Sequence, residues 1–404
     1  MDTSKMMHIT NLDSKGLIEL EEKAERLERE GAELKSALAL QNIRNEIADI
    51  IEENYDFGQV TDIYEIFGGY VNRSFGVACE KDGRRTNYFV RKFNLVTTTV
   101  DVELEHKLIN YVKGHGFPEI AWPYQTKAGP TYVEKNERFE GTWRPRLYAA
   151  YVYLEGQDKH SWAKANATPG ELRSLGAMHA RYHNAGRDFD EGHLKKEEPR
   201  IDKFYKTFPQ AFQDMASRPF KESYFHDYFN ETLPQILELL KTYIIPDDVW
   251  AKMPLTTVHG DFHAGNLKFD GEEATGMFDL DWAKINYRLF DVCLTALYVA
   301  QSWKADDDGR LRLDDCRYYL ESYNQTLREL GGLEPFNDTE KQWFVQMFHV
   351  GNLFLINWCT DGWYYQDPAG HNDYEGQRYM NHFLSSFPQI NDQRAELEKL
   401  IGQV

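Results

Sequence analysis

The sequence has few cysteines and no long apolar run. Its four cysteines, Cys79, Cys293, Cys316 and Cys359, stand far apart and form no C-x-x-C pair. A disulfide framework and a zinc knuckle are therefore both disfavoured, and we expect a cytoplasmic protein in a reducing compartment. The first 16 residues lack an apolar stretch of signal-peptide length, and the most apolar helix candidate, residues 292–299, is too short to span a bilayer.

Positive charge is scarce as well. The chain has 46 Lys and Arg residues against 65 Asp and Glu residues, which gives a net charge of −19 at pH 7. This excess of carboxylates disfavours nucleic acid and anionic membranes as partners, because both attract basic surfaces. A small molecule is expected instead, and the negative charge favours a cationic one.

Two further absences narrow the fold. The motif G-x-x-x-x-G-K-[ST] does not occur, which excludes a P-loop NTPase, and there are no internal repeats. A chain of 404 residues exceeds one ordinary core, so more than one domain is expected. The patterns predict an N-terminal helical extension over residues 1–54, a small β-rich N-lobe over 55–154 and a large helical C-lobe over 155–404.

The N-terminal extension has heptad-like spacing. Apolar residues recur from Leu17 to Leu38, with Glu, Lys and Arg between them, which is typical of a helix that packs along a narrow seam. We favour a helix that packs on its own domain, because Ala24 and Gly31 dilute the apolar seam. A homodimer formed through this helix is the alternative.

One segment in the second half of the chain carries the strongest functional motif. Asp261 and Asn266 stand five apart in H-G-D-F-H-A-G-N, the spacing of the catalytic Asp and the metal-binding Asn in the protein-kinase loop H-R-D-x-x-x-x-N. An Asp-Gly turn between two short apolar runs predicts a β-hairpin that returns Asp279 to the side of Asn266. The pattern thus predicts a Mg²⁺ site at Asn266 and Asp279, joined by Asp281, and an acceptor-side carboxylate at Asp261.

These residues resemble a known family. H-G-D-F-H-A-G-N, F-D-L-D-W at residues 278–282 and N-Y-R-L-F-D at residues 286–291 are similar to the aminoglycoside phosphotransferase and choline kinase superfamily. N-Y-R-x-F-D is especially similar to choline and ethanolamine kinases, whereas H-G-D-x-H-A-G-N resembles a bacterial stress-response serine/threonine kinase equally well. The resemblance implies a bilobal kinase-like α+β fold and a phosphoryl transfer from ATP. It also implies that Asp291 braces the catalytic loop; its carboxylate can in addition cap the helix that it opens.

The N-lobe contains candidates for nucleotide binding. Gly69 lies in a Gly-Gly turn that permits close approach of a phosphate, and Asn72 follows it. Alone, such a turn is more often only a hairpin. By resemblance, residues 148–156 form the hinge that holds the adenine.

A strand over residues 87–93, N-Y-F-V-R-K-F, carries two adjacent cations. A strand Lys reaches the α/β-phosphates in kinases while it pairs with a helix Glu, and we expect Lys92 and Glu105 in these roles. Glu103 is the alternative to Glu105, but for Glu103 we favour a position on a solvated helix face. Strand alternation puts Arg91 and Lys92 on opposite faces, so only one faces the nucleotide. The resemblance prefers Lys92, with Arg91 as the alternative.

Two histidine pairs raise the question of a further metal. His179 and His183 are four apart in a predicted helix, a spacing that can bind a metal, but packed and hydrogen-bonded histidines are favoured because no third ligand is evident. His259 and His263 share the loop already explained by phosphoryl transfer. Their motif lacks the Glu of H-E-x-x-H, so a zinc hydrolase is the poorer interpretation.

The acceptor site is predicted near the C-terminal end of the chain. Its candidate residues are Trp358, Asp361, Trp363 and Tyr364. Aromatic faces beside a carboxylate attract an ammonium group, and the resemblance implies an acceptor pocket in the helical lobe. The alternative is that these rings only pack the end of that lobe.

Together these patterns predict an enzyme that uses ATP and Mg²⁺ to phosphorylate a hydroxyl of a small molecule. The acceptor is an amino alcohol such as choline or ethanolamine, an aminoglycoside or a sugar. A serine/threonine protein kinase of the stress-response type is the alternative, but Asp279 and Asp291 are only 12 positions apart, which leaves little platform for a polypeptide. A catalytically inactive nucleotide-binding pseudokinase is a third reading. The retained Asp261, Asn266 and Asp279 disfavour it.

Overall fold

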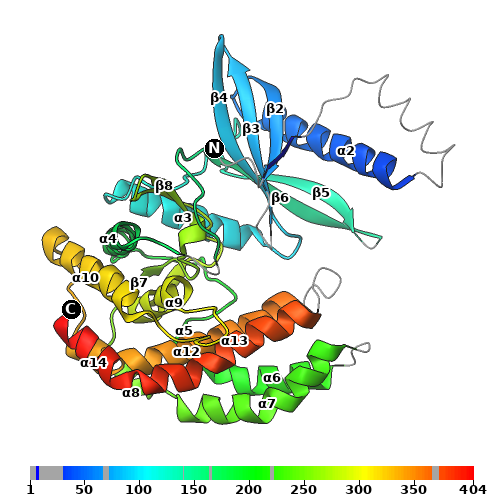
Figure 1. Cartoon of the computed structure of the whole chain (residues 1–404). Helices are drawn as coiled ribbons and strands as arrows, with labels where there is room; N and C mark the ends of the chain where they lie inside the picture. The colour runs from blue at the N-terminus through cyan, green and yellow to red at the C-terminus, as the bar shows by residue number, and fades with distance from the viewer. Residues whose placement is uncertain are drawn as a thin grey trace. The chain divides into compact units, whose positions relative to one another are not determined.

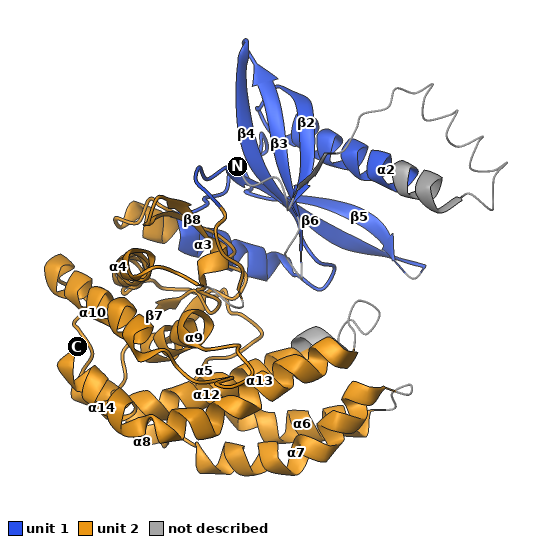
Figure 2. Cartoon of the chain, in the orientation of Figure 1, with its two compact units in different colours: residues 1–109, 120–157 blue, residues 110–119, 158–404 orange. Residues whose placement is uncertain are grey.

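The computed structural model describes residues 6–8, 31–66, 72–139, 141–162, 166–218, 223–365 and 373–404, and for residues 6–8, 31–37 and 362–365 it describes the backbone alone. The chain forms two compact units (Figure 2). Unit 1 comprises residues 1–109 and 120–157, and unit 2 comprises residues 110–119 and 158–404.

Unit 1 is built on an antiparallel sheet. Within the described residues the sheet has six strands in the order β1-β2-β3-β4-β6-β5 (Figure 1). These strands are β1 (Met6–His8), β2 (Gln59–Ile66), β3 (Arg73–Lys81), β4 (Arg84–Lys92), β5 (Val133–Phe139) and β6 (Thr142–Val152). In β4 and β6 the apolar and aromatic residues are concentrated in the C-terminal half of each strand, where most positions are buried, and Arg91 is paired in register with Ala149.

Two helices flank the strands of unit 1 in sequence. The helix α2 (Gly31–Asn54) buries Ile43, Ile47 and Ile51 in the same core as Phe75 of β3. The C-terminal half of this helix therefore packs on the sheet of its own unit. Most of the heptad-like stretch falls on residues 9–30, outside the described part of the chain, so a homodimer through it stays a prediction. The helix α3 (Thr99–Gly114) follows β4.

Unit 2 is mainly helical. Within the described residues, its α-helices are α4 (Pro169–Ala185), α5 (Ile201–Phe204), α6 (Phe208–Ser217), α7 (Tyr224–Thr242), α8 (Asp247–Trp250), α9 (Arg288–Ala300), α10 (Leu313–Leu330), α11 (Asp338–Gln342), α12 (Phe344–Asn357), α13 (Asp373–Asp392) and α14 (Arg394–Gln403). The π-helix η4 (Trp358–Tyr365) continues α12. Two antiparallel strand pairs lie among them: β7 (Leu255–Val258) with β10 (Lys284–Tyr287), and β8 (Leu267–Asp270) with β9 (Glu273–Met277). A β-rich unit and a helical unit confirm the predicted α+β class.

The helix α4 illustrates how sequence sets local structure in unit 2. Thr168 and Glu171 form a reciprocal capping box, and Pro169 occupies the first turn, where a missing N–H costs nothing. Leu172, Leu175 and Met178 are fully buried, and α4 packs against α10. Among the described residues, no helix combines the length and apolarity that a membrane crossing requires.

Candidate active site

The loop between β7 and β8 has a backbone that requires glycine. Gly260 has a φ of +79°, and a Cβ at this position would lie 2.9 Å from both the carbonyl oxygen and the Cβ of Trp282. A larger residue would have to displace this neighbouring backbone and strain its own. The tight turn of H-G-D thus brings Gly260, which precedes Asp261, close to Trp282, which follows Asp281.

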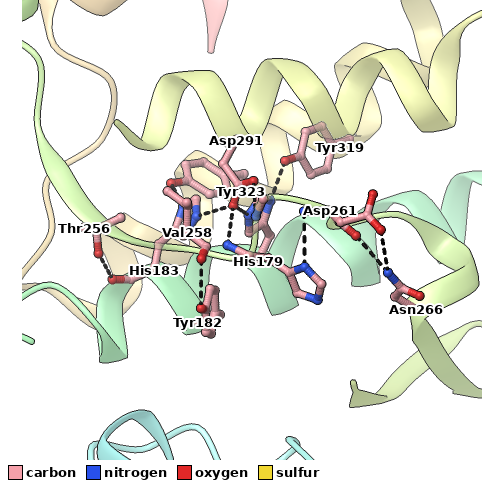
Figure 3. Close-up of polar contacts among 12 residues, drawn as sticks. His179, Tyr182, His183, Thr256, Val258, Asp261, Asn266, Asp291, Tyr319 and Tyr323 are labelled. Carbon is pink, nitrogen blue, oxygen red and sulfur yellow. Dashed lines mark hydrogen bonds and ion pairs between the residues drawn. The ribbon is translucent and has the colours of Figure 1, made fainter. Parts of the chain in front are cut away.

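Asp261 and Asn266 lie side by side, as their spacing predicted. The side-chain amide of Asn266 donates to the carbonyl oxygen of Asp261 at 3.0 Å and to its carboxylate at 3.3 Å (Figure 3). Nε2 of His263 lies 3.4 Å from the same carboxylate, whose side chain keeps 28% exposure. Asp261 is therefore fixed by its own loop and yet partly open to a reactant.

The surroundings keep Asp261 charged. Burial raises the pKa of this carboxyl, but the imidazoles of His263 and His259 and a hydrogen bond from Tyr298 outweigh burial and hold the pKa below its usual range. The same carboxylate contributes, after burial, to raising the pKa of Tyr298 well above its usual range, so this phenol stays protonated. At neutral pH the loop presents a carboxylate that can accept a hydrogen bond from a hydroxyl.

The predicted β-hairpin is confirmed. β8 and β9 pair with Leu267 opposite Met277, and the N–H of Phe278 donates to the carbonyl of Asn266 at 3.1 Å. The next residue, Asp279, has a φ of +66°, a left-handed conformation that Asp tolerates better than most residues. The hairpin and this sharp turn return Asp279 to the neighbourhood of Asn266.

The oxygen donors of this corner fit a divalent cation. Asn266 uses its amide nitrogen on Asp261, which leaves the carbonyl oxygen of its side chain outside those two bonds. Asp279 and Asp281 add carboxylates, and hard oxygen ligands suit Mg²⁺. Lys196 donates to the main-chain carbonyl of Asp281, which ties residues 186–200 to the same corner.

Asp291 braces the catalytic loop from a neighbouring helix. Its two carboxylate oxygens accept hydrogen bonds from the N–H groups of His259 and Gly260, both at 2.9 Å, and the side chain is 0% exposed (Figure 3). The helix α9 begins three residues earlier, at Arg288. The carboxylate therefore does not cap its own helix as expected; it caps the loop.

His179 and His183 complete this arrangement. Their Nε2 atoms lie 3.0 and 3.1 Å from Oδ2 of Asp291, and their Nδ1 atoms lie 2.7 Å from the hydroxyls of Tyr319 and Tyr323 respectively. Each ring thus has a hydrogen-bond partner on both nitrogens, as the favoured interpretation expected. We name these five residues the Asp291 cluster.

The Asp291 cluster also contains a possible third metal ligand beside the two histidines, which the sequence did not reveal. His179, His183 and Asp291 offer ligand atoms within 4.8 Å of one another, a geometry that suits a metal. However, the phenol donors direct the Nε2–H groups to the carboxylate, so hydrogen bonds already account for this geometry. Burial and the neighbouring His179 lower the pKa of His183 to about 3, whereas the two imidazoles hold the pKa of Asp291 below its usual range despite burial.

In unit 1, Arg91 and not Lys92 forms the buried ion pair with the helix α3. Nη1 of Arg91 lies 3.8 Å from Oε1 of Glu105, and both side chains are 5% exposed or less. Lys92 instead pairs with Glu46 of α2 at 2.7 Å and with Glu137 of β5 at 3.5 Å. The expected pair of Lys92 with Glu105 is therefore wrong. Alternation along β4 turns Arg91 toward α3 and Lys92 toward α2.

The remaining nucleotide candidates are placed as follows. The side-chain oxygen of Asn72 accepts from the N–H of Asn94 at 2.8 Å and so closes the loop that follows β4. Gly69 lies outside the described residues. The roles of both residues toward a nucleotide stay predictions.

The roles of the predicted acceptor residues stay predictions, and the structure describes the side chains of two of them. Trp358 is half-buried, and Asp361 forms an ion pair with Arg218 at 3.2 Å. The side chains of Trp363 and Tyr364 lie outside the described part. Trp358 instead belongs to a set of rings that the sequence did not group together. This aromatic cluster comprises Trp162, Trp303, Trp358 and Tyr379.

The aromatic cluster reaches the catalytic loop through Tyr298. The centroid of the Trp162 ring lies 5.0 Å from Tyr379, 6.2 Å from Trp358 and 6.5 Å from Tyr298. The Tyr298 ring in turn lies 5.4 Å from His263. One signal for this residue was present in the sequence, because Tyr298 stands seven positions after Asp291 and thus on the same face of a helix.

Comparison with known proteins decides the family. Residues 64–333 match the phosphotransferase enzyme family, APH. The chain belongs to this family. It is also 24% identical over 292 residues to a homoserine kinase of Methylobacillus flagellatus, which covers 70% of this chain and 76% of that protein. The predicted superfamily is thereby confirmed.

Solved structures confirm the kinase-like fold. Spectinomycin phosphotransferase APH(9)-Ia, in complex with ADP and spectinomycin, superposes with a TM-score of 0.56 at 15% identity, over 89% of this chain and 98% of that chain. Choline kinase from Cryptosporidium parvum Iowa II gives a TM-score of 0.56 at 13% identity, over 89% and 99%. The phosphotransferase family member described here is an ATP-dependent kinase that acts on a hydroxyl of a small molecule.

Proposed function

We propose that this phosphotransferase phosphorylates a small hydroxylated amine, with Asp261 as the acceptor-side base. The observation that carries the proposal is the continuity from Asp261 through Tyr298 to the aromatic cluster. The acceptor oxygen would form a bond to the γ-phosphorus of ATP while the bond to the β,γ-bridging oxygen breaks. The hydroxyl proton passes to Asp261. A deprotonated Asp261 suits a loose transition state, because catalysis then depends mainly on positioning the acceptor hydroxyl and the phosphoryl group.

Asn266 and Asp279 would hold a Mg²⁺ ion, with Asp281 as a third oxygen donor. The ion, when bound, neutralises the charge of the phosphates. Asn266 contributes in a second way, because its amide N–H groups fix the orientation of Asp261. The metal corner and the base are thus coupled through one side chain.

On the phosphate side, the described contacts favour Arg91 over Lys92. Arg91 is the cation that pairs with the α3 carboxylate of Glu105, and its guanidinium carbon lies 5.8 Å from each of the rings of Phe89, Phe93 and Tyr151. Such packing holds the guanidinium in one orientation and favours multidentate binding of phosphate oxygens. Lys92 would then have a structural role between α2 and β5.

The aromatic cluster would form one wall of the acceptor site. Trp162, Trp303 and Trp358 are each half-buried, so each residue keeps some surface that a ligand could contact. Aromatic faces attract an ammonium group, and the net charge of −19 favours a cationic guest over an anionic one. This cluster replaces Trp363 and Tyr364 as the main aromatic determinant in the proposal.

A hydroxy amino acid is the second candidate acceptor. The guanidinium carbon of Arg378 lies 5.9 Å from the ring centroid of Trp303, which would place a cation for a carboxylate beside the aromatic wall. The similarity to a homoserine kinase supports the same class of acceptor. An amine and a carboxylate on one short hydroxylated chain would then both be recognised.

An ATP-consumption screen tests these proposals. The full chain with Mg²⁺ is assayed against ethanolamine, choline, homoserine, spectinomycin, a hexose and a generic protein. We expect turnover with an amine-bearing alcohol and a KM that rises with ionic strength, because salt screens attraction to an acidic surface. Turnover only with the hexose or only with the protein would reject the proposal. No turnover with any of them, together with retained nucleotide binding, would reject both candidate acceptor classes.

A further inference from the structure

A chain of hydrogen bonds ends on the carboxylate of Glu105. The hydroxyl of Tyr151 lies 3.2 Å from Oε1 of Glu105 and 2.8 Å from Nε2 of His106, and Nδ1 of His106 lies 2.6 Å from the hydroxyl of Thr131. His106, Glu105 and Tyr151 are 2–3% exposed. The four residues come from α3, β6 and the segment before β5, and all of them belong to unit 1.

The direction of these bonds is determined by chemistry. Glu105 only accepts when charged, so Tyr151 must donate to it. The phenol oxygen then accepts from Nε2–H of His106, and Nδ1 of the same ring accepts from the hydroxyl of Thr131. Burial and the charge of Arg91 lower the pKa of His106 to about 3, which is consistent with a neutral ring.

We infer that His106 and Tyr151 are positioning residues for nucleotide binding, acting through Glu105 on Arg91. Oε1 of Glu105 is the atom that faces Arg91 at 3.8 Å, and it is also the atom that Tyr151 holds. The phenol therefore fixes the carboxylate that fixes the guanidinium. The ring of Tyr151 also lies 5.8 Å from the guanidinium carbon of Arg91. Tyr151 therefore contacts Arg91 directly through its ring and indirectly through the hydrogen bond to Glu105. This inference rests on the proposed role of Arg91 at the phosphates.

The chain of hydrogen bonds requires one particular tautomer of His106, with the proton on Nε2. A ring in the other tautomer, with its proton on Nδ1, would present a lone pair to the lone pair of Tyr151. The phenol would then have to turn its proton toward the ring, and Glu105 would lose the hydrogen bond from Tyr151. The Glu105 carboxylate therefore selects the Nε2–H tautomer through Tyr151, and the hydroxyl of Thr131, which can donate or accept, turns to donate to Nδ1.

Calorimetric titration of the full chain with Mg·ADP tests the inference without an acceptor. Tyr151→Phe should raise the Kd about tenfold, which corresponds to one lost hydrogen bond to a charged group. The matched control is Tyr132→Phe. This phenol donates at 2.9 Å to Glu103, a neighbouring carboxylate on the exposed side of the same helix, so its loss should change the Kd less than about twofold.

Two His106 variants separate donation from packing. His106→Gln keeps an N–H near the position of Nε2 and should retain most of the affinity, whereas His106→Leu should lose as much as Tyr151→Phe. In ¹⁵N-histidine spectra the native ring should show the Nε2–H tautomer, and Tyr151→Phe should change this signal. Equal affinities for the Gln and Leu variants, or an Nδ1–H tautomer in the native protein, would reject the role of His106.

Arg91→Met distinguishes this inference from the proposal beneath it. If Arg91→Met weakens Mg·ADP binding and Tyr151→Phe matches its Tyr132→Phe control, the positioning role falls and the phosphate role stands. If Arg91→Met has no effect, the phosphate role falls. A strong effect of Tyr151→Phe in that case would show that the phenol acts on another group, which also contradicts the inference.

Discussion

Asn266 holds Asp261 by two hydrogen bonds, one to its carbonyl oxygen and one to its carboxylate. A residue proposed to bind the metal thus also orients the residue proposed to accept the proton. Metal binding and proton acceptance thus both depend on the side-chain amide of Asn266. Variants that keep Asn266 in place are therefore needed to measure the two functions separately.

Asp261→Asn is the first such variant. It removes the acceptor-side charge, keeps the shape of the side chain and leaves every proposed metal ligand in place. We expect kcat to fall at least about 10³-fold, since base and orientation are lost together, while the Kd for Mg·ATP stays within about threefold. A coupled ADP-release assay and calorimetry measure the two quantities. Asp270→Asn, in the exposed β8–β9 turn, is the control; an unchanged kcat for Asp261→Asn would refute the base assignment.

Asp279→Asn should have the opposite signature. Asn tolerates the left-handed φ of +66° at this position, so the backbone is kept while a charged oxygen ligand is lost. We expect Mg²⁺-dependent nucleotide binding to weaken by at least about tenfold. Asp82→Asn is a matched control, because Asp82 also has a positive φ, of +54°, in the turn between β3 and β4. Normal Mg·ATP affinity in Asp279→Asn would place the metal elsewhere.

The aromatic cluster gives a third prediction. Trp162→Ala should raise the KM for an amine-bearing alcohol about 2- to 30-fold, which corresponds to roughly 0.5 to 2 kcal/mol of cation–π attraction, and should leave the KM for ATP unchanged. Trp143→Ala is the control, because Trp143 is 69% exposed on β6 of unit 1. A KM that changes for ATP and not for the alcohol would contradict an acceptor wall.

Buried neutral histidines predict a stability that falls in acid. Burial lowers the pKa of His349 to about 3, against about 6.5 in an unfolded chain. Between these values the unfolded state binds a proton that the folded state does not, so the free energy of unfolding decreases as the pH falls. The slope is at most about 1.4 kcal/mol per pH unit for each such residue. Stability is fully present above about pH 6.5.

His349→Gln should remove one such contribution and flatten the dependence between about pH 6 and pH 4. Urea denaturation at several pH values measures the slope. Phe212→Leu is the control, since this fully buried ring of α6 packs against Phe208 and Phe229, and its loss should lower stability equally at every pH. A slope that is unchanged by His349→Gln would show that the imidazole becomes protonated before the chain unfolds.

The catalytic loop and hairpin were predictable because their signals are local. Asp261, Asn266 and Asp279 lie within 19 positions of one another, and an Asp-Gly turn set the return of the chain. The partner of Lys92 was not predictable in the same way. Alternation showed that Arg91 and Lys92 face opposite sides, but only the packing of α2 and α3 decides which side meets Glu105.

Contacts between distant segments were missed for the same physical reason. The pairing of His179 with Tyr319 spans 140 positions, as does that of His183 with Tyr323. The two histidines are four positions apart, and so are the two tyrosines, so each pair lies on one face of its helix. This spacing does not indicate that the two helices are neighbours. Trp162 is similarly remote in sequence from the other rings of the aromatic cluster.

The Asp291 cluster affects the conformational entropy of the loop that carries Asp261. The N–H groups of His259 and Gly260 are held by a carboxylate of α9, and this carboxylate is held by two rings of α4. We therefore expect the loop to resist loosening, because release of these two N–H groups requires the packing of two helices to open. We expect the entropy cost of ordering the loop to arise during folding and not to recur in each catalytic cycle.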